Sequence, residues 1–215
     1  MNTCKIHACG ALWVLLVVII AHSPVFTFGS ALPVFRIDSA LIVQSDSLLI
    51  DDFSNSNGIS YFGTRWRMFT DRVMGGLSTA TWDYTTVEGR SCVQLRGNVS
   101  LANNGGFIQI ALPLTKEGWA LDASSFKGIR IWALGNGETY HIHLRSNDSR
   151  LPWQYYGAGF VADSSWQLHD IPFSEFVPEG LEVELKTDRL VRIAVVAIKK
   201  EIKADIAVAR LEFYR

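Results

Sequence analysis

The chain has 215 residues, of which 48% are hydrophobic and 19% are charged. This composition supplies enough apolar side chains for one packed domain and excludes wholesale disorder. The 20 Lys and Arg residues nearly balance the 21 Asp and Glu residues, with no long run of either sign. The balance argues against nucleic acid as the main partner, because phosphate binding needs a basic field.

The first segment of the chain has the pattern of a secretory signal peptide. Lys5 precedes an unbroken apolar run over residues 11–21. The helix-breaking His22-Ser23-Pro24 follows, and then the small residues Gly29-Ser30-Ala31. The run is shorter than the roughly 20 residues that span a bilayer. We expect cleavage near Ala31 and a periplasmic or secretory location, with retention of residues 1–31 as a membrane anchor as the alternative. Residues 32–47 are expected to form a lead-in.

From residue 48 onward the chain reads as short strands separated by turn residues. The predicted strands are 48–53, 65–70, 79–84, 91–96, 107–112, 128–134, 139–146, 154–161, 166–171, 192–198 and 208–214. Residues 175–182 are expected to hold a short turn, and no segment shows a long helical period. Many short strands with few helices predict an all-β fold, an antiparallel β-sandwich forming one domain over residues 48–215.

Two details of the strands carry further predictions. Apolar residues recur at every second position in 129–133 and in 140–144, so each of these strands should bury one face. Asn136-Gly137 between them is typical of a hairpin turn. Cys92 is the one cysteine beyond the leader, and its alternating apolar neighbours predict a buried strand residue rather than a reactive thiol.

Two Gly-Gly motifs precede predicted strands, and each is a candidate binding corner. In the first, Asp71 stands before Gly75, Gly76 and Ser78. Glycine allows positive φ angles and close approach of another chain, so Asp71 could serve as an acceptor beside exposed backbone N–H groups. The alternative is structural: Asp71 caps the turn and the glycines permit the bend.

The second motif places amides beside glycines. Asn98 is followed by Asn103, Asn104, Gly105 and Gly106. Asparagine amides both donate and accept hydrogen bonds, as binding of sugar hydroxyls requires. Turn formation and capping of strand edges explain the same residues equally well.

In order along the chain, these motifs resemble the complex I intermediate-associated protein 30 family. The resemblance rests on Asp71-x-Val73-Met74-Gly75-Gly76-x-Ser78, Gly97-Asn98-Val99-Ser100-Leu101, Asn103-Asn104-Gly105-Gly106-Phe107, Leu144-Arg145, Tyr156, Trp166 and Ile171-Pro172-Phe173-Ser174. It implies a galactose-binding-domain-like jelly-roll sandwich and, at least for the mitochondrial members, a role in assembling respiratory NADH:ubiquinone oxidoreductase. No catalytic residues are carried over from the family, and we expect no cofactor. A mitochondrial location is implied by the family alone.

Further candidate residues lie on the later strands. His141, His143 and Arg145 alternate on one strand and should share a face, where the two histidines could ligate a metal or simply form a polar strand surface. Arg145 is also a candidate contact for a partner.

Aromatic residues cluster in the same part of the chain. Trp132, Trp153, Tyr155 and Tyr156 could form a platform for a sugar or an apolar peptide segment, although Tyr155 and Tyr156 must point to opposite faces. Trp153, which follows Pro152 in a loop-like stretch, is the candidate expected to be most exposed.

The sequence contains neither Gly-x-Ser-x-Gly nor His-Glu-x-x-His, and we expect no enzyme activity. Two hypotheses follow. The first is a non-catalytic assembly or chaperone-like factor that contacts protein partners, for example subunits of a respiratory complex. The second is an exported carbohydrate-binding module that binds a glycan through its asparagines and Trp153.

Overall fold

The computed structural model describes residues 34–35 and 46–215. The expected signal peptide or anchor over residues 1–31 and most of the expected lead-in therefore lie outside the described residues. Within the described part of the chain, no helix is long and apolar enough to cross a membrane.

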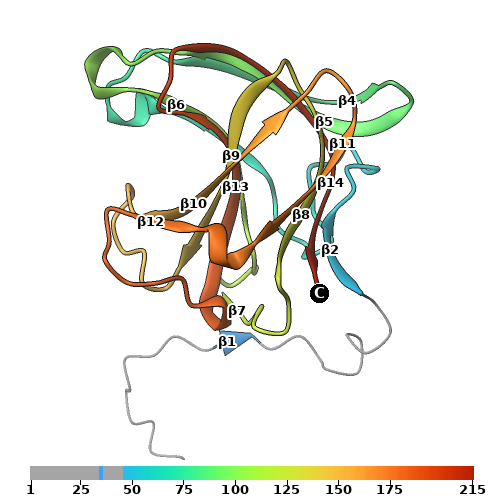
Figure 1. Ribbon diagram of the computed structural model, residues 1–215, viewed down its shortest axis with the longest axis vertical. Coiled ribbons are helices and arrows are strands. Elements are labelled where there is room, and N and C mark those ends of the chain that lie inside the picture. The colour runs from blue at the N-terminus through green and yellow to red at the C-terminus, as the bar shows by residue number, and fades with distance from the viewer. Residues whose placement is uncertain (1–33, 36–45) are drawn as a thin grey trace, which may run out of the picture. The chain divides into compact units, whose positions relative to one another are not determined.

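Two β-sheets face each other across one apolar core, as predicted (Figure 1). We name them sheet A and sheet B. All strand pairs are antiparallel except β1 with β7. The chain is therefore an antiparallel β-sandwich, in which the buried face of each sheet faces the other sheet.

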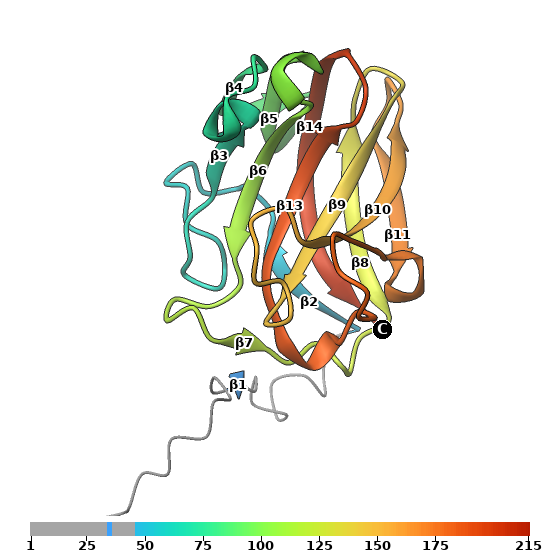
Figure 2. The same cartoon turned by 90° about the vertical axis from the view of Figure 1, so that its left-hand side faces the viewer.

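Sheet A contains eight of the described strands. They are β1 (Val34–Phe35), β3 (Arg67–Thr70), β6 (Phe107–Pro113), β7 (Ala120–Leu121), β9 (Glu138–Ser146), β10 (Tyr155–Ala162), β12 (Val177–Glu179) and β13 (Leu190–Ile198). The strands run side by side in the order β3-β6-β13-β9-β10-β12, and β7 with β1 continues the sheet beside the start of β13 (Figure 2).

Sheet B contains six strands of the described part. They are β2 (Ser47–Asp51), β4 (Thr79–Val87), β5 (Arg90–Val99), β8 (Gly128–Leu134), β11 (Gln167–Pro172) and β14 (Ile202–Tyr214). The order is β11-β8-β14-β5-β4, with β2 beside the end of β14. In residues 46–215, four short 3-10 helices join strands: η1 (Asp71–Met74), η2 (Ala102–Asn104), η3 (Phe173–Glu175) and η4 (Thr187–Arg189).

The burial of β9 and β13 explains their different sequence patterns. On β9, Tyr140, Ile142 and Leu144 are fully buried in the core, so apolar residues alternate with polar ones. On β13, the run 193–197 is buried on both faces and is apolar throughout. A strand covered on both sides loses the alternation. The outer face of sheet A must therefore be covered along part of β13.

The predicted hairpin at Asn136-Gly137 is wrong. β8 pairs with β11 and β14 in sheet B, whereas β9 pairs with β10 and β13 in sheet A, so the turn connects the two sheets. The Asn136 amide donates to the Lys203 carbonyl at 2.8 Å and accepts from the Tyr140 hydroxyl at 2.8 Å. Two strands joined by a hairpin within one sheet and two strands joined by an arch between sheets both bury every second residue. The alternation of apolar residues therefore does not distinguish the two connections.

The predicted strands are otherwise found, with shifted ends, and the largest shift is at the start of β14. The strand predicted over 128–134 coincides with β8, and β14 begins at Ile202 rather than at residue 208. The short strands β1, β7 and β12 were not predicted. Residues 175–182 contain the end of η3 and β12, and Cys92 is fully buried as expected.

Candidate functional site

The two Gly-Gly motifs meet at the Asp71 carboxylate. Its oxygens accept hydrogen bonds from the Ser78 backbone N–H at 2.9 Å, the Ser78 hydroxyl at 2.5 Å and the Gly106 N–H at 2.6 Å. A longer bond comes from the Phe107 N–H at 3.4 Å. Asp71 and Ser78 are both fully buried. Their polar groups are thus hydrogen-bonded within the protein, as expected if Asp71 has a structural role rather than a ligand-binding one.

The glycines fit closely around this carboxylate. A Cβ at Gly76 would overlap the Asp71 carboxyl carbon, and one at Gly105 would lie 2.5 Å from the Asp71 Oδ2. Gly75 has a φ of 89° and closes η1, and Gly106 has a φ of 131°. Glycine is required at these positions because a side chain would either clash or strain the backbone. The two motifs therefore build one corner between β3, β4 and β6.

Among the described side chains, the asparagines of the second motif do not take part in the hydrogen bonds around Asp71. Asn98 is exposed on β5 of sheet B, and Asn103 is exposed in η2 with a φ of 56°. Of Asn104 only the backbone, also in η2, is described. Asn98 and Asn103 do not line the groove described next.

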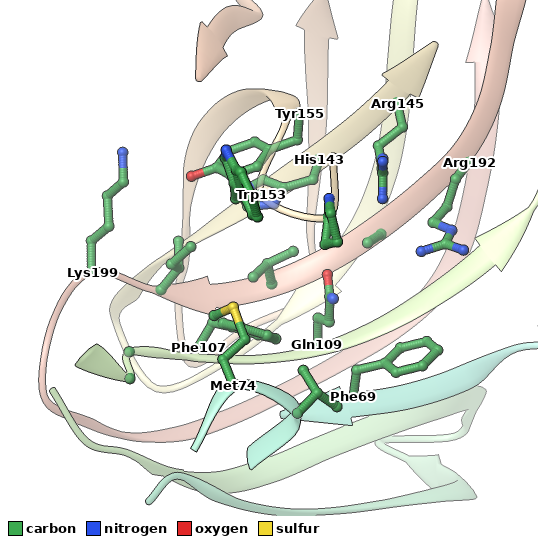
Figure 3. A pocket seen from close by; sticks show the side chains of 17 residues that line it. Phe69, Met74, Phe107, Gln109, His143, Arg145, Trp153, Tyr155, Arg192 and Lys199 are labelled. Carbon is green, nitrogen blue, oxygen red and sulfur yellow. The ribbon is translucent and has the colours of Figure 1, made fainter. Parts of the chain in front are cut away.

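A groove of about 620 Å³ crosses the outer face of sheet A (Figure 3). This volume lies in the range of small-molecule and peptide clefts. It is lined by Phe69, Val73, Met74, Gly105, Gly106, Phe107, Gln109, His143, Arg145, Pro152, Trp153, Tyr155, Arg192, Ala194, Val196, Ile198 and Lys199. The groove borders the Gly-Gly corner through Gly105 and Gly106 and through η1.

The floor of the groove is apolar at its centre. Ala194 and Val196 are buried there and cluster with the neighbouring Ala111, with Phe69 and Phe107 packed against them. This second, smaller cluster covers the outer face of β13 and accounts for the burial of that strand on both sides. An apolar floor beneath an open groove favours a ligand with apolar groups.

The rim carries exposed apolar side chains on both sides. Val73 and Met74 of η1 are 72% and 52% exposed, and Trp153 on the opposite side is 56% exposed. Figure 3 shows Met74 and Trp153 facing each other across the groove. Exposed apolar residues gathered at a groove are typical of binding surfaces.

Trp153 is held by a braced loop. The Gln154 side chain accepts hydrogen bonds from the backbone N–H groups of Arg150 and Leu151, both at 2.9 Å, and donates to the Gly180 carbonyl at 2.9 Å. A Cβ at Gly180 would lie 3.0 Å from the Trp153 ring. The exposed indole is thus presented in a defined position.

The four residues of the predicted aromatic platform lie in three separate places: the groove, the core and the outer face of sheet B. Trp153 and Tyr155 line the groove, and Tyr155 stacks on His143 with ring centroids 3.8 Å apart. Tyr156, a predicted contact residue, is instead fully buried in the core because it points to the other face of β10. Trp132 lies on the outer face of sheet B, where Arg90 stacks over it at 4.6 Å.

The two histidines and Arg145 share the outer face of sheet A, as predicted. Burial lowers the pKa of His143 to about 3, with His141 and Lys199 adding to the effect, so this imidazole is uncharged at neutral pH. Its Nε2 is buried without a hydrogen-bond partner. Among the described residues, no group of three or more His, Cys, Asp and Glu could hold a metal ion.

Two arginines without acidic partners among the described residues lie at one end of the groove, and a lysine that pairs with a carboxylate lies at the other. Arg145 and Arg192 lie together at the first end, and Lys199 at the second end pairs with Glu179 at 2.7 Å (Figure 3). Burial and the neighbouring Arg192 lower the pKa of Arg145. The half-buried positive charge of Arg145 and Arg192 favours an anionic group on the ligand.

Several groove residues were not predicted. Phe69, Phe107 and Arg192 lie on strands far apart in the sequence and looked like ordinary strand residues. The positive charge of Arg192 within the apolar strand 190–198 was the one available indication, because a cation at the edge of such a run must face outward.

The sandwich is similar in structure to carbohydrate-binding modules of Clostridium thermocellum. The family 11 module, solved with a β-1,3-1,4-mixed-linked tetrasaccharide, has a TM-score of 0.58 and 15% identity, over 78% of this chain and 95% of the module. The family 30 module of a cellulosomal cellulase has a TM-score of 0.51 and 14% identity, over 77% and 95%. At such low identity the similarity establishes the β-sandwich fold alone.

The sequence itself matches none of the proteins with curated descriptions. It does match a family over residues 52–205, which is most of the chain and includes both Gly-Gly motifs. The resemblance drawn from those motifs is confirmed: the chain belongs to the family of complex I intermediate-associated protein 30 (CIA30).

Proposed function

We propose that this protein is a non-catalytic binding factor that assists assembly of respiratory complex I by holding a segment of a partner subunit in the groove of sheet A. Membership of the CIA30 family supports the assembly role. The observation that carries the proposal is the groove itself, an apolar floor between the exposed side chains of Met74 and Trp153. A polypeptide segment with apolar side chains would cover this surface.

Crosslinking in cells tests the proposal directly. A photoreactive amino acid at Met74 should crosslink to complex I subunits, identified by mass spectrometry. The same group at Leu168, which is 44% exposed on β11 of sheet B, is the matched control and should not. Loss of the gene should lower the amount of assembled complex I on native gels. Unchanged complex I levels together with no subunit crosslinked from Met74 would refute the assembly role.

A second candidate is an exported carbohydrate-binding module. Trp153 and Tyr155 offer aromatic rings in the groove, and aromatic rings stack on sugars. The fold similarity to glycan-binding modules is consistent with this function. A glycan array tests this second candidate. Saturable sugar binding that is lost in Trp153→Ala, together with no crosslink to any complex I subunit, would favour the carbohydrate-binding module over the assembly factor.

The location of the protein bears on both candidates. We propose that residues 1–31 direct export or anchor the chain at a membrane; export would place the groove outside the cytosol. Determination of the mature N-terminus tests this proposal. A mature chain that begins at Met1 in a soluble cytosolic fraction would contradict it.

A further inference from the structure

The two arginines of the groove occupy directly opposite positions on adjacent strands. Arg145 on β9 is the register partner of Arg192 on β13, and both side chains are half-buried. Like charges at opposite positions of an antiparallel pair destabilise a sheet, because their Cβ atoms are only about 5 Å apart. The fold therefore carries an unfavourable contact at the end of its groove.

No carboxylate within the described residues compensates this contact. Arg145 donates from one nitrogen to the Ser149 and Leu151 carbonyls, at 2.7 and 2.9 Å, and has no acidic partner there. Arg192 makes neither a hydrogen bond nor an ion pair within the same part of the chain. The other half-buried arginines differ: Arg130, Arg189 and Arg210 each pair with a carboxylate, at 2.6, 3.0 and 2.7 Å.

The surroundings of the pair add to its positive character. Burial lowers the pKa of Arg192, and the nearby Arg67 lowers it further. Both groove arginines also line a second hollow of about 420 Å³, to which Lys116 contributes another cation. The pair thus stands between two hollows, and a chain lying along the groove would pass over it.

We propose that Arg145 and Arg192 bind a carboxylate of the partner segment, while apolar side chains next to it in that segment lie between Met74 and Trp153. The inference rests on the proposed function and specifies its ligand as an acidic-apolar polypeptide. Two guanidinium groups match the planar carboxylate with paired hydrogen bonds. Arg145 is already oriented by its bonds to the loop, and a bound anion removes the repulsion between the arginines.

Peptides that differ only in the carboxylate test the inference. The probe is an array of peptides with apolar residues followed by Glu, each beside a counterpart with Gln, and the best pair is measured by fluorescence anisotropy. We expect the Glu peptide to bind at least about tenfold more tightly than the Gln peptide, the range of charge-assisted hydrogen bonds. The double variant Arg145→Gln, Arg192→Gln should abolish this preference.

The control removes one charge elsewhere. Arg90→Gln on the outer face of sheet B should keep the full preference for Glu, and circular dichroism should show that all variants are folded. Trp153→Ala should weaken both peptides of the pair, because it removes an apolar contact they share.

The possible failures are distinguishable. Equal affinity for Glu and Gln peptides, with both weakened by Trp153→Ala, would overturn the carboxylate site and leave the peptide groove intact. Absence of binding to every peptide would overturn both the carboxylate site and the proposed function. Binding that depends on Arg145 and Arg192 but is seen only for uronate-bearing glycans would assign the site to carbohydrate and overturn the peptide ligand.

Discussion

Asp71 shows how one buried charge joins two parts of the chain that are distant in sequence. Burial alone would raise the pKa of this carboxyl, but hydrogen bonds from Ser78, Gly106 and Phe107 outweigh that effect and hold the pKa below its usual value. The ionised carboxylate is therefore the form that stabilises the corner. Its stabilising contribution is present above the unfolded pKa of about 3.9 and is lost as the pH falls through the lower folded value.

Asp71→Asn should lower the free energy of unfolding by about 3 kcal/mol, because the amide nitrogen would face donors and the charge-assisted hydrogen bonds would be lost. Urea denaturation at pH 7 measures the change. Asp83→Asn is the matched control, because the Asp83 side chain is 63% exposed and its ion pair with Arg96 is long at 3.8 Å. The control should change stability by less than about 0.5 kcal/mol. Equal effects of the two substitutions would contradict the structural role of Asp71.

His143 should make the protein less stable in mild acid. Its folded pKa of about 3 is far below the unfolded value of about 6.5, so below pH 6.5 the unfolded chain takes up a proton that the folded chain does not. Stability then falls as the pH falls toward 3, with a slope of up to about 1.4 kcal/mol per pH unit. His141 and Lys199, which also face this imidazole, act in the same direction.

The test compares wild type with His143→Gln by urea denaturation between pH 7 and pH 4. Carboxylates titrate equally in both proteins, so the difference between the two stability curves isolates the histidine. The variant should lose less stability in acid. Parallel curves would show that His143 is not held neutral by burial.

At the scale of elements, the facing arginines of strands β9 and β13 lower the stability of sheet A while they supply the positive charge of the groove. Removing one of two facing like charges relieves repulsion, so Arg192→Gln should raise the free energy of unfolding by about 0.5 kcal/mol. Arg130→Gln provides the contrast, because Arg130 pairs with Asp170 through two hydrogen bonds, at 2.6 and 2.8 Å. It should lower stability. Thermal denaturation of both variants measures the effects, and a loss of stability in Arg192→Gln would refute the repulsion.

Strands were predictable from their apolar alternation, but their partners were not. The pattern in 129–133 and 140–144 correctly identified β8 and β9 and their buried faces. It could not tell that the two strands lie in opposite sheets, because each buries its apolar face in the same core from its own side. Turn chemistry at Asn136-Gly137 specified a tight bend without specifying the sheet of the returning strand.

At the scale of the whole molecule, polar bonds tie the two sheets together beside the apolar core. The Tyr140 hydroxyl on β9 accepts from the backbone N–H of Asp205 on β14 at 2.9 Å. The indole N–H of Trp66, the residue before β3 of sheet A, donates to the Asp51 carboxylate on β2 of sheet B at 2.8 Å. These bonds fix how one sheet lies over the other, which apolar contacts alone do less specifically.

Tyr140→Phe should lower the free energy of unfolding by about 1–2 kcal/mol, because the Asp205 N–H would lose its acceptor at a half-buried position. Tyr61→Phe is the control: its hydroxyl bonds to Asp52 at 3.2 Å on the exposed surface. That substitution should have little effect on urea denaturation. An equal cost for both would show that the bond between the sheets adds nothing.

By itself the sequence determined the all-β class, most strand positions and the family, because alternation and the spacing of the two Gly-Gly motifs are local properties. It also identified Trp153 and Arg145 as separate candidate contacts, and only the structure places both at one groove. Only the tertiary structure decided that Asp71 is buried between the motifs, that Tyr156 faces the core, and that Arg192 stands opposite Arg145. These facts depend on which strands pair and which face is covered, and both are set by contacts between residues far apart in the chain.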